Sequence, residues 1–254
     1  MTTLVDSGAN FTGATAVAVG DCVILDKSGA VPEWGYVSAV VSATELTIAG
    51  GFSSGGSGSG RAYAIVDKSA YTGAHAAKIE YLTGTLAEKS EIVILNGTTA
   101  VDTVNTDFYR VNSFRIIAAG SGAKLVGNLT LRADGAGTVY SYISAGFTRA
   151  RNIMYTVPAS KTLYVIQWSA SYSITGNPNK EYGRLYTRAN IEPSTKFNTG
   201  AIFYPYTEIA MQNNTVAITY ELPTRLPAGT DIKVSGLATV SGVVSTVLRG
   251  WLEW

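Results

Sequence analysis

Residues 163–172 have the sequence LYVIQWSASY. Large and small side chains partly alternate along this run, as expected for a strand whose two faces differ. Similar short runs rich in β-branched and aromatic residues recur between Gly, Asn, Asp, Ser and Pro, and no window of helical length shows a convincing helical repeat. The sequence therefore predicts an all-β protein with a sandwich or barrel architecture. The other expected strands include residues 21–25, 35–41, 45–48, 91–95, 113–118, 127–132, 215–222 and 231–234.

A change of organisation is expected at residues 50–60, where the sequence GGFSSGGSGSG has almost no side chains to bury. Such a run loses much backbone entropy on ordering, so it predicts a loop or hairpin tip. A further strand is expected at residues 61–67. We therefore predict a small barrel-like β module at residues 1–67, a linker at 68–77, and an antiparallel, jelly-roll-like β-sandwich at 78–254.

Two local signals predict how strands are connected. Asn96 and Gly97 form the pair typical of a two-residue hairpin, here between residues 92–95 and a strand that resumes at Ala100. Pro223 and Pro227 bracket an extended crossing that follows the strand at residues 215–222.

The charge balance argues against a nucleic-acid or membrane partner. Of 254 residues, 46% are apolar and only 15% are charged, and 19 Lys and Arg against 18 Asp and Glu give a net charge of +1. Binding to nucleic acid or to an anionic membrane needs clustered positive charge. A lightly charged, near-neutral surface suits a protein that packs against other proteins.

The first residues lack the pattern of a signal peptide, and no apolar run approaches the roughly 18 residues that span a bilayer. We therefore expect synthesis in the cytoplasm.

The search for catalytic or metal-binding residues identifies none. Cys22 is the single cysteine, which excludes an internal disulfide, and its apolar setting predicts a small buried side chain. His75 is the single histidine and falls in the expected linker, whereas a metal site normally needs three or four ligands. The letters GSGSG at residues 56–60 match a nucleophile elbow only by chance, within a low-complexity loop. We predict no catalytic, cofactor-binding or metal-binding residue, no cofactor, and no enzymatic activity.

The acidic residues leave one alternative open. Asp102, Asp107 and Asp134 lie near expected turns, where Asp commonly bonds to local backbone. Paired acids for glycoside cleavage can still meet in three dimensions, so a sugar-cleaving enzyme is not excluded by spacing alone. Such enzymes are usually longer and show a repeat, which this sequence lacks.

Aromatic and basic residues gather in two stretches, residues 140–151 and 182–188. With 15 Tyr in the chain, this composition fits protein–protein contact first, and carbohydrate stacking, single-stranded nucleic acid or ordinary strand packing less well.

The chain ends with Trp251 and Trp254 in an apolar strand. We expect these two residues to pack in the core or at a subunit interface rather than to form a ligand platform.

The sequence contains VGDCV at residues 19–23, VSAV at 37–40 and LTI at 46–48, together with further strand-and-turn phrases. These phrases resemble virion structural proteins of tailed bacteriophages that infect aquatic bacteria, including cyanobacteria. The first is a module in which a Val-Gly-Asp-x-Val strand precedes a Val-x-Ala-Val strand and a Leu-Thr-Ile strand. The others are strand-and-turn phrases spread over most of the chain. The matching residues are VGDCV at 19–23, VSAV at 37–40, LTI at 46–48, IVILNGTTAV at 92–101, YRV at 109–111, GNLTL at 127–131, MYTVPASKTLY at 154–164 and PAGTDIKV at 227–234.

The resemblance implies a particle component and does not fix which one. Our leading hypothesis is a capsid decoration (cement) protein that binds the major capsid protein or another virion protein. We expect a homo-oligomer, a trimer, located on the capsid surface or the tail, with no nucleic-acid or membrane partner. The alternative is a tail, baseplate or fibre component that contacts host surface glycans. A third hypothesis is a small polysaccharide-cleaving tail enzyme. The resembling phrases contain no catalytic signature, so they transfer no functional residue.

Overall fold

The computed structural model describes the backbone of most of the chain. The described residues are 2–13, 16–27, 32–50, 52, 60–69, 72–135, 137–151, 154–174, 185–193, 204–211, 215–238 and 242–254; side chains are described in these ranges except at 172–174, 185–193, 204–211, 234–238 and 242–244.

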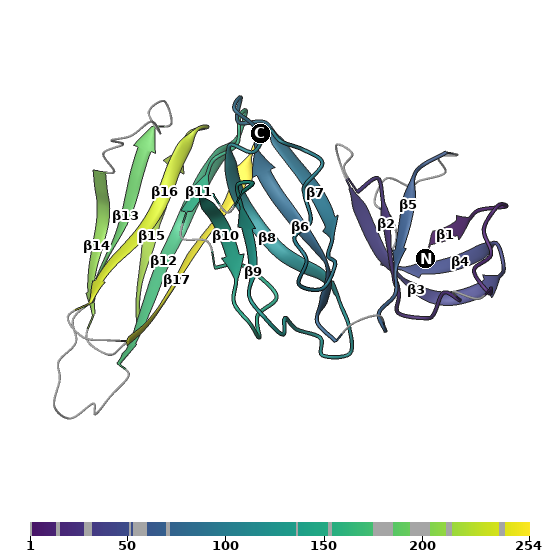
Figure 1. The fold of residues 1–254 in the computed structure, drawn as a ribbon. Helices are drawn as coiled ribbons and strands as arrows, with labels where there is room; N and C mark the ends of the chain where they lie inside the picture. Colours follow the sequence, from purple (N-terminus) through teal and green to yellow (C-terminus); the bar gives the residue numbers. More distant parts are fainter. Residues whose placement is uncertain are drawn as a thin grey trace. The chain divides into compact units, whose positions relative to one another are not determined.

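These residues form antiparallel β-sheets, which confirms the predicted all-β class (Figure 1). Each expected strand named above overlaps an observed one, except the strand expected to resume at Ala100. Within the described ranges, neither a closed barrel nor a jelly roll is identified, and no helix has the length and apolar character needed to cross a bilayer.

The chain divides into two compact units. The first comprises Met1–Thr83 and Lys89–Arg151, and the second comprises Gly84–Glu88 and Asn152–Trp254. These divisions differ from the expected boundaries at residues 67 and 78.

The first unit contains three sheets, with strand orders β1-β4-β3-β2-β5, β7-β6-β8 and β10-β9. Each sheet contributes to at least one of three buried apolar clusters. The strands are β1 Thr2–Val5, β2 Cys22–Leu25, β3 Glu33–Ser42, β4 Glu45–Ala49, β5 Tyr63–Val66, β6 Ala74–Leu82, β7 Glu88–Ile94, β8 Arg110–Ala119, β9 Leu129–Arg132 and β10 Val139–Ile143.

Strand β2 is buried on both faces, which explains its unbroken apolar sequence. Val23 and Leu25 point into a cluster inside the N-terminal sheet. Cys22 and Ile24 point the other way, into a cluster that also contains Ala76 and other residues of β6, β7 and β8. Because successive strand residues face opposite sides, a strand between two clusters is apolar at every position.

The same cluster accounts for the difference from the expected linker at residues 68–77. Strand β6 begins at Ala74, so the end of that range is strand rather than connector. Its residues 74–77 have few charged or large side chains because Ala76 and Ala77 are almost fully buried. A run of small residues was interpreted as a linker, whereas here it allows close packing.

The second unit contains two sheets, with orders β11-β16-β13-β14 and β15-β12-β17. A buried cluster draws on both of them: Val165 and Leu226 come from the second sheet, and Ile232 comes from the first. The strands are β11 Met154–Thr156, β12 Thr162–Ile174, β13 Leu185–Pro193, β14 Tyr204–Met211, β15 Thr215–Leu226, β16 Thr230–Ala238 and β17 Gly242–Glu253.

A β-bulge explains why alternation along residues 163–172 is only partial. Val165 and Trp168 are both buried, although they are three positions apart. The register of β12 shifts between Val165 and Gln167 against both neighbouring strands, and Ile166 is the extra residue. Because the bulge adds one residue, the side chains of Trp168 and Ala170 point into the core, as that of Val165 does.

Strand β15 also differs from its expected extent. It continues through Pro223 to Leu226, whereas the sequence predicted that the strand would end before this proline. β15 lies at one edge of its sheet, where a residue without an N–H is tolerated because one side of the strand makes no ladder bonds.

Candidate functional site

The two residues with the most obvious reactive side chains are buried. Cys22 is 2% exposed, and burial, reinforced by the Asp21 carboxylate, raises the pKa of its thiol to about 12. It is therefore a protonated core side chain, as predicted. His75 is also 2% exposed and lies in β6, not in a linker. Within the described ranges, no three His, Cys, Asp or Glu side chains come close enough together to hold a metal ion.

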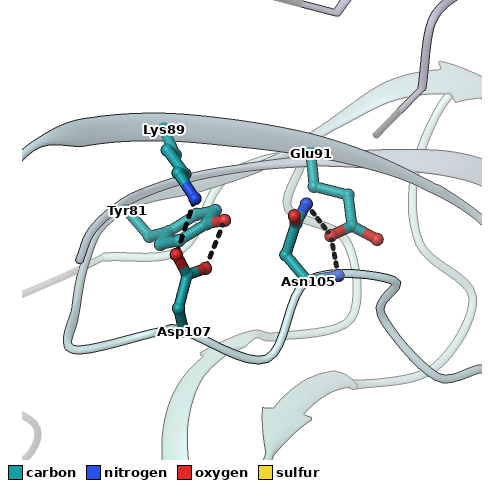
Figure 2. A network of polar contacts seen from close by, with 5 residues as sticks. All are labelled: Tyr81, Lys89, Glu91, Asn105 and Asp107. Atoms are coloured by element: carbon teal, nitrogen blue, oxygen red, sulfur yellow. Dashed lines mark hydrogen bonds and ion pairs between the residues drawn. The ribbon is translucent and has the colours of Figure 1, made fainter. Parts of the chain in front are cut away.

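A polar network anchors an irregular segment, residues 100–109, to β7 (Figure 2). The carboxylate of Glu91 is buried and accepts hydrogen bonds from the backbone N–H of Val104 at 2.7 Å and of Asn105 at 3.0 Å. The side-chain amide of Asn105 donates a third, at 2.7 Å. A buried carboxylate is costly unless donors surround it, and here the segment supplies them.

The second half of the network joins the same segment to β6. Asp107 accepts hydrogen bonds from the Tyr81 hydroxyl at 3.0 Å and from the Lys89 ammonium at 2.6 Å (Figure 2). Phe108 stacks on the Tyr81 ring with centroids 4.0 Å apart. The Lys89 ammonium, helped by the Tyr81 hydroxyl, lowers the pKa of Asp107, and burial raises the pKa of Tyr81.

This network corrects one prediction and qualifies another. Asn96 and Thr99 pair across a tight turn at Gly97 and Thr98, one residue later than the expected turn at Asn96 and Gly97, and no strand resumes at Ala100. Asp107 bonds to two distant side chains as well as to local backbone, whereas Asp134 accepts a hydrogen bond from the Gly135 N–H as expected. Each carboxylate in Figure 2 is held by donors of the protein itself, so the arrangement secures the fold.

The described residues support only part of the expected aromatic and basic cluster. Tyr140 and Tyr142 project from β10 and are more than half exposed. The guanidinium of Arg151 lies 4.3 Å from the Phe147 ring centroid. Tyr182 lies outside the described residues, and the side chain of Tyr186 is not described. The prediction for residues 182–188 therefore lies outside the side chains that the structure describes.

The C-terminal strand carries an exposed aromatic surface. The Trp251 ring stacks on Tyr164 of the neighbouring strand β12, with centroids 5.3 Å apart and planes 11° apart. The side chain is still 42% exposed. The pairing of Tyr164 with Trp251 places both rings on one face of the sheet, because directly opposite residues share a face. We call this side the outer face, since Leu163 and Val165 point to the buried cluster.

Trp254 is a second exposed aromatic residue at this end of the chain. It is 93% exposed, and the Lys161 ammonium lies 4.3 Å from its ring centroid. Lys161 is also ion-paired with Glu88. The prediction of core packing for Trp251 and Trp254 is therefore wrong, and the alternative, an interface, stays a prediction.

The network and the C-terminal surface were not equally visible in the sequence. Glu91 and Asn105 show no recognisable spacing, because their contact depends on how the segment at 100–109 folds back. By contrast, the sequence RGWLE at 249–253 contains a visible signal. In a strand, Arg249, Trp251 and Glu253 share one face.

Comparison with known proteins returned no match. Neither a model of a protein family, nor a curated protein, nor a solved structure matches this chain.

Proposed function

We propose that this chain is a non-enzymatic structural protein of a tailed-bacteriophage particle, and specifically a capsid decoration protein. Its partner is the major capsid protein or another virion protein, and it works as a homo-oligomer, a trimer, on the capsid surface or tail. It is made in the host cytoplasm and needs no cofactor, nucleic acid or membrane. In finer architecture, we propose a barrel-like N-terminal module and a jelly-roll-like sandwich.

The observation that supports this proposal best is the exposed C-terminal strand. Tryptophan is among the residues most enriched at the energetic centres of protein interfaces. Trp254 leaves almost its entire side chain in solvent, and Trp251, three residues earlier on a strand with few charges, is 42% exposed. A lightly charged chain with aromatic residues exposed at one end is suited to burying that end against another protein.

The mechanism follows from binding linkage. A subunit that binds the assembled lattice but not its separate components stabilises the lattice by mass action. Aromatic burial supplies much of the affinity, and the large area of a multi-subunit contact provides specificity. No bond is made or broken, which is why this function needs no catalytic group.

Removal of residues 250–254 tests the proposal. We expect the chain truncated after Arg249 to be lost from purified particles, because the aromatic contacts disappear. Since Leu252 and Trp251 also pair with β12, Trp254→Ala provides a variant with an intact sheet. Leu222→Ala, at an equally exposed residue of β15, is the matched control. Unchanged incorporation of both the truncated chain and Trp254→Ala would contradict the proposal.

The alternative is a tail, baseplate or fibre component that binds host surface glycans. The exposed stacked pair of Tyr164 and Trp251 favours it, because aromatic faces stack on sugar rings. In that case Trp251→Ala, or replacement of both Tyr182 and Tyr186, abolishes adsorption to the host while the particle stays intact. Adsorption that persists after all three changes removes the reason for this alternative.

A further inference from the structure

The two edges of the sheet β15-β12-β17 differ in how they are protected. An edge strand presents unpaired backbone N–H and C=O groups, and proteins usually protect such edges with charges, prolines or bulges. β15 contains Pro223, Glu221 and Arg225, and its pairing with β12 jumps from Thr219 to Thr224. β17 contains neither proline nor lysine, and it pairs with β12 from Gly242 to Glu253. Within the described residues, no strand covers the other side of β17.

The sequence of β17 is self-complementary in one antiparallel register. Its two charged residues are Arg249 and Glu253, and Trp251 lies midway between them. If two copies of β17 pair antiparallel about Trp251, Arg249 of each copy lies opposite Glu253 of the other. Any other antiparallel register of two identical strands separates these charges.

The side chains that this register brings together also share one face of the sheet, the outer face. Arg249, Trp251 and Glu253 lie on the outer face, since Trp251 and Glu253 are joined there by a 3.0 Å hydrogen bond and Arg249 is opposite Gln167. Neither Arg249 nor Glu253 forms an ion pair with another described side chain. Their charges are available to a partner.

We propose that β17 pairs with β17 of a second copy of this chain, in an antiparallel, two-fold contact centred on Trp251. Two three-stranded sheets then form one continuous sheet. Its outer face carries a row of four aromatic rings, Tyr164 and Trp251 from each copy, flanked by two Arg249–Glu253 pairs. Cross-strand aromatic and opposite-charge pairs both stabilise such a ladder.

This inference rests on the proposed use of the C-terminal strand as an association surface, and it names the partner. The contact has two-fold symmetry, so it joins two copies and does not itself build the proposed trimer. A charge-exchange experiment on the full chain tests it by sedimentation equilibrium over a concentration series. Arg249→Glu places four acids at the contact, and Glu253→Arg places four bases there. We expect each variant to weaken the dimer by roughly tenfold or more.

Two combinations provide the decisive results. The double variant Arg249→Glu/Glu253→Arg restores opposite charges and is expected to dimerise like the original chain. Mixing the two single variants is expected to restore a dimer as well, because the acidic strand of one faces the basic strand of the other. Arg225→Glu, on the other edge of the sheet, is the control and is expected to leave the association unchanged.

Other outcomes would overturn the inference. A chain that stays monomeric at high concentration, or that forms a trimer insensitive to these charges, shows that β17 does not pair with itself. If such a chain still enters particles in a manner that depends on Trp254, the proposed function survives and only the identity of the partner is wrong. If it dimerises as expected but never enters particles, the proposed function fails and the inference stands.

Discussion

Glu91 and Trp254 contrast two ways in which this chain places its side chains. Glu91 is a charged residue that is 2% exposed, and Trp254 is an aromatic residue that is 93% exposed. The carboxylate tolerates burial because three donors surround it, so its role ends within the fold. The indole has almost no protein around it beyond Lys161, and in the proposed function a partner buries it. The first site is expected to control stability, and the second is expected to control association.

The largest effect on stability is expected for Glu91→Ala. This change leaves the backbone N–H groups of Val104 and Asn105 without their acceptor and detaches residues 100–109 from β7. We expect a loss of about 3 kcal/mol in the free energy of unfolding, measured by urea denaturation. Glu221→Ala, at an exposed position on β15, is the control and should change stability by less than about 0.5 kcal/mol. Equal stability of the two variants would show that the network in Figure 2 does not hold the segment.

A smaller effect, dependent on pH, is expected at Asp107. Lys89 and Tyr81 lower the pKa of Asp107 in the folded state. The contribution of Asp107 to stability is therefore complete above its unfolded-state pKa of about 3.9, and it is lost as the pH falls through the lower folded-state pKa. Asp107→Asn should therefore lower the urea midpoint at pH 7, and the difference from the original chain should shrink towards pH 3. A difference that is constant from pH 7 to pH 3 would exclude the ion pair as its cause.

The smallest effect on stability is expected for Trp254→Ala. Since the indole is almost fully exposed, we expect the free energy of unfolding to change by less than about 0.5 kcal/mol. The same variant should lose association with particles, which separates the two roles. A large loss of stability would instead place Trp254 among the residues that hold the fold.

The sequence predicted the strands well and the connections poorly, for physical reasons. Alternation and β-branched runs are local properties, so the strand at residues 163–172 was visible even though a bulge at Ile166 interrupts it. The expected linker at 68–77 failed at Ala76 because small side chains indicate either flexibility or close packing. Ala76 lies in one buried cluster with Ile92 and Ile117, and this shows that its small side chain serves close packing and not flexibility.

The candidate surface was predictable in part. The spacing of Arg249, Trp251 and Glu253 follows from strand periodicity alone, but whether the indole faces the core depends on which side of β12 carries Val165 and Trp168. The contact of Glu91 with Asn105 could not be predicted, because it depends on the path of an irregular segment that has no periodicity.

The most direct test of the proposed function is the copy number of this protein relative to the major capsid protein in purified particles, measured by quantitative mass spectrometry. A decoration protein predicts hundreds of copies, in a simple ratio to the lattice subunit. Absence from purified particles would contradict the proposed function. A few copies to a few dozen would contradict the capsid assignment and favour the tail, where binding to host glycans becomes the question to test.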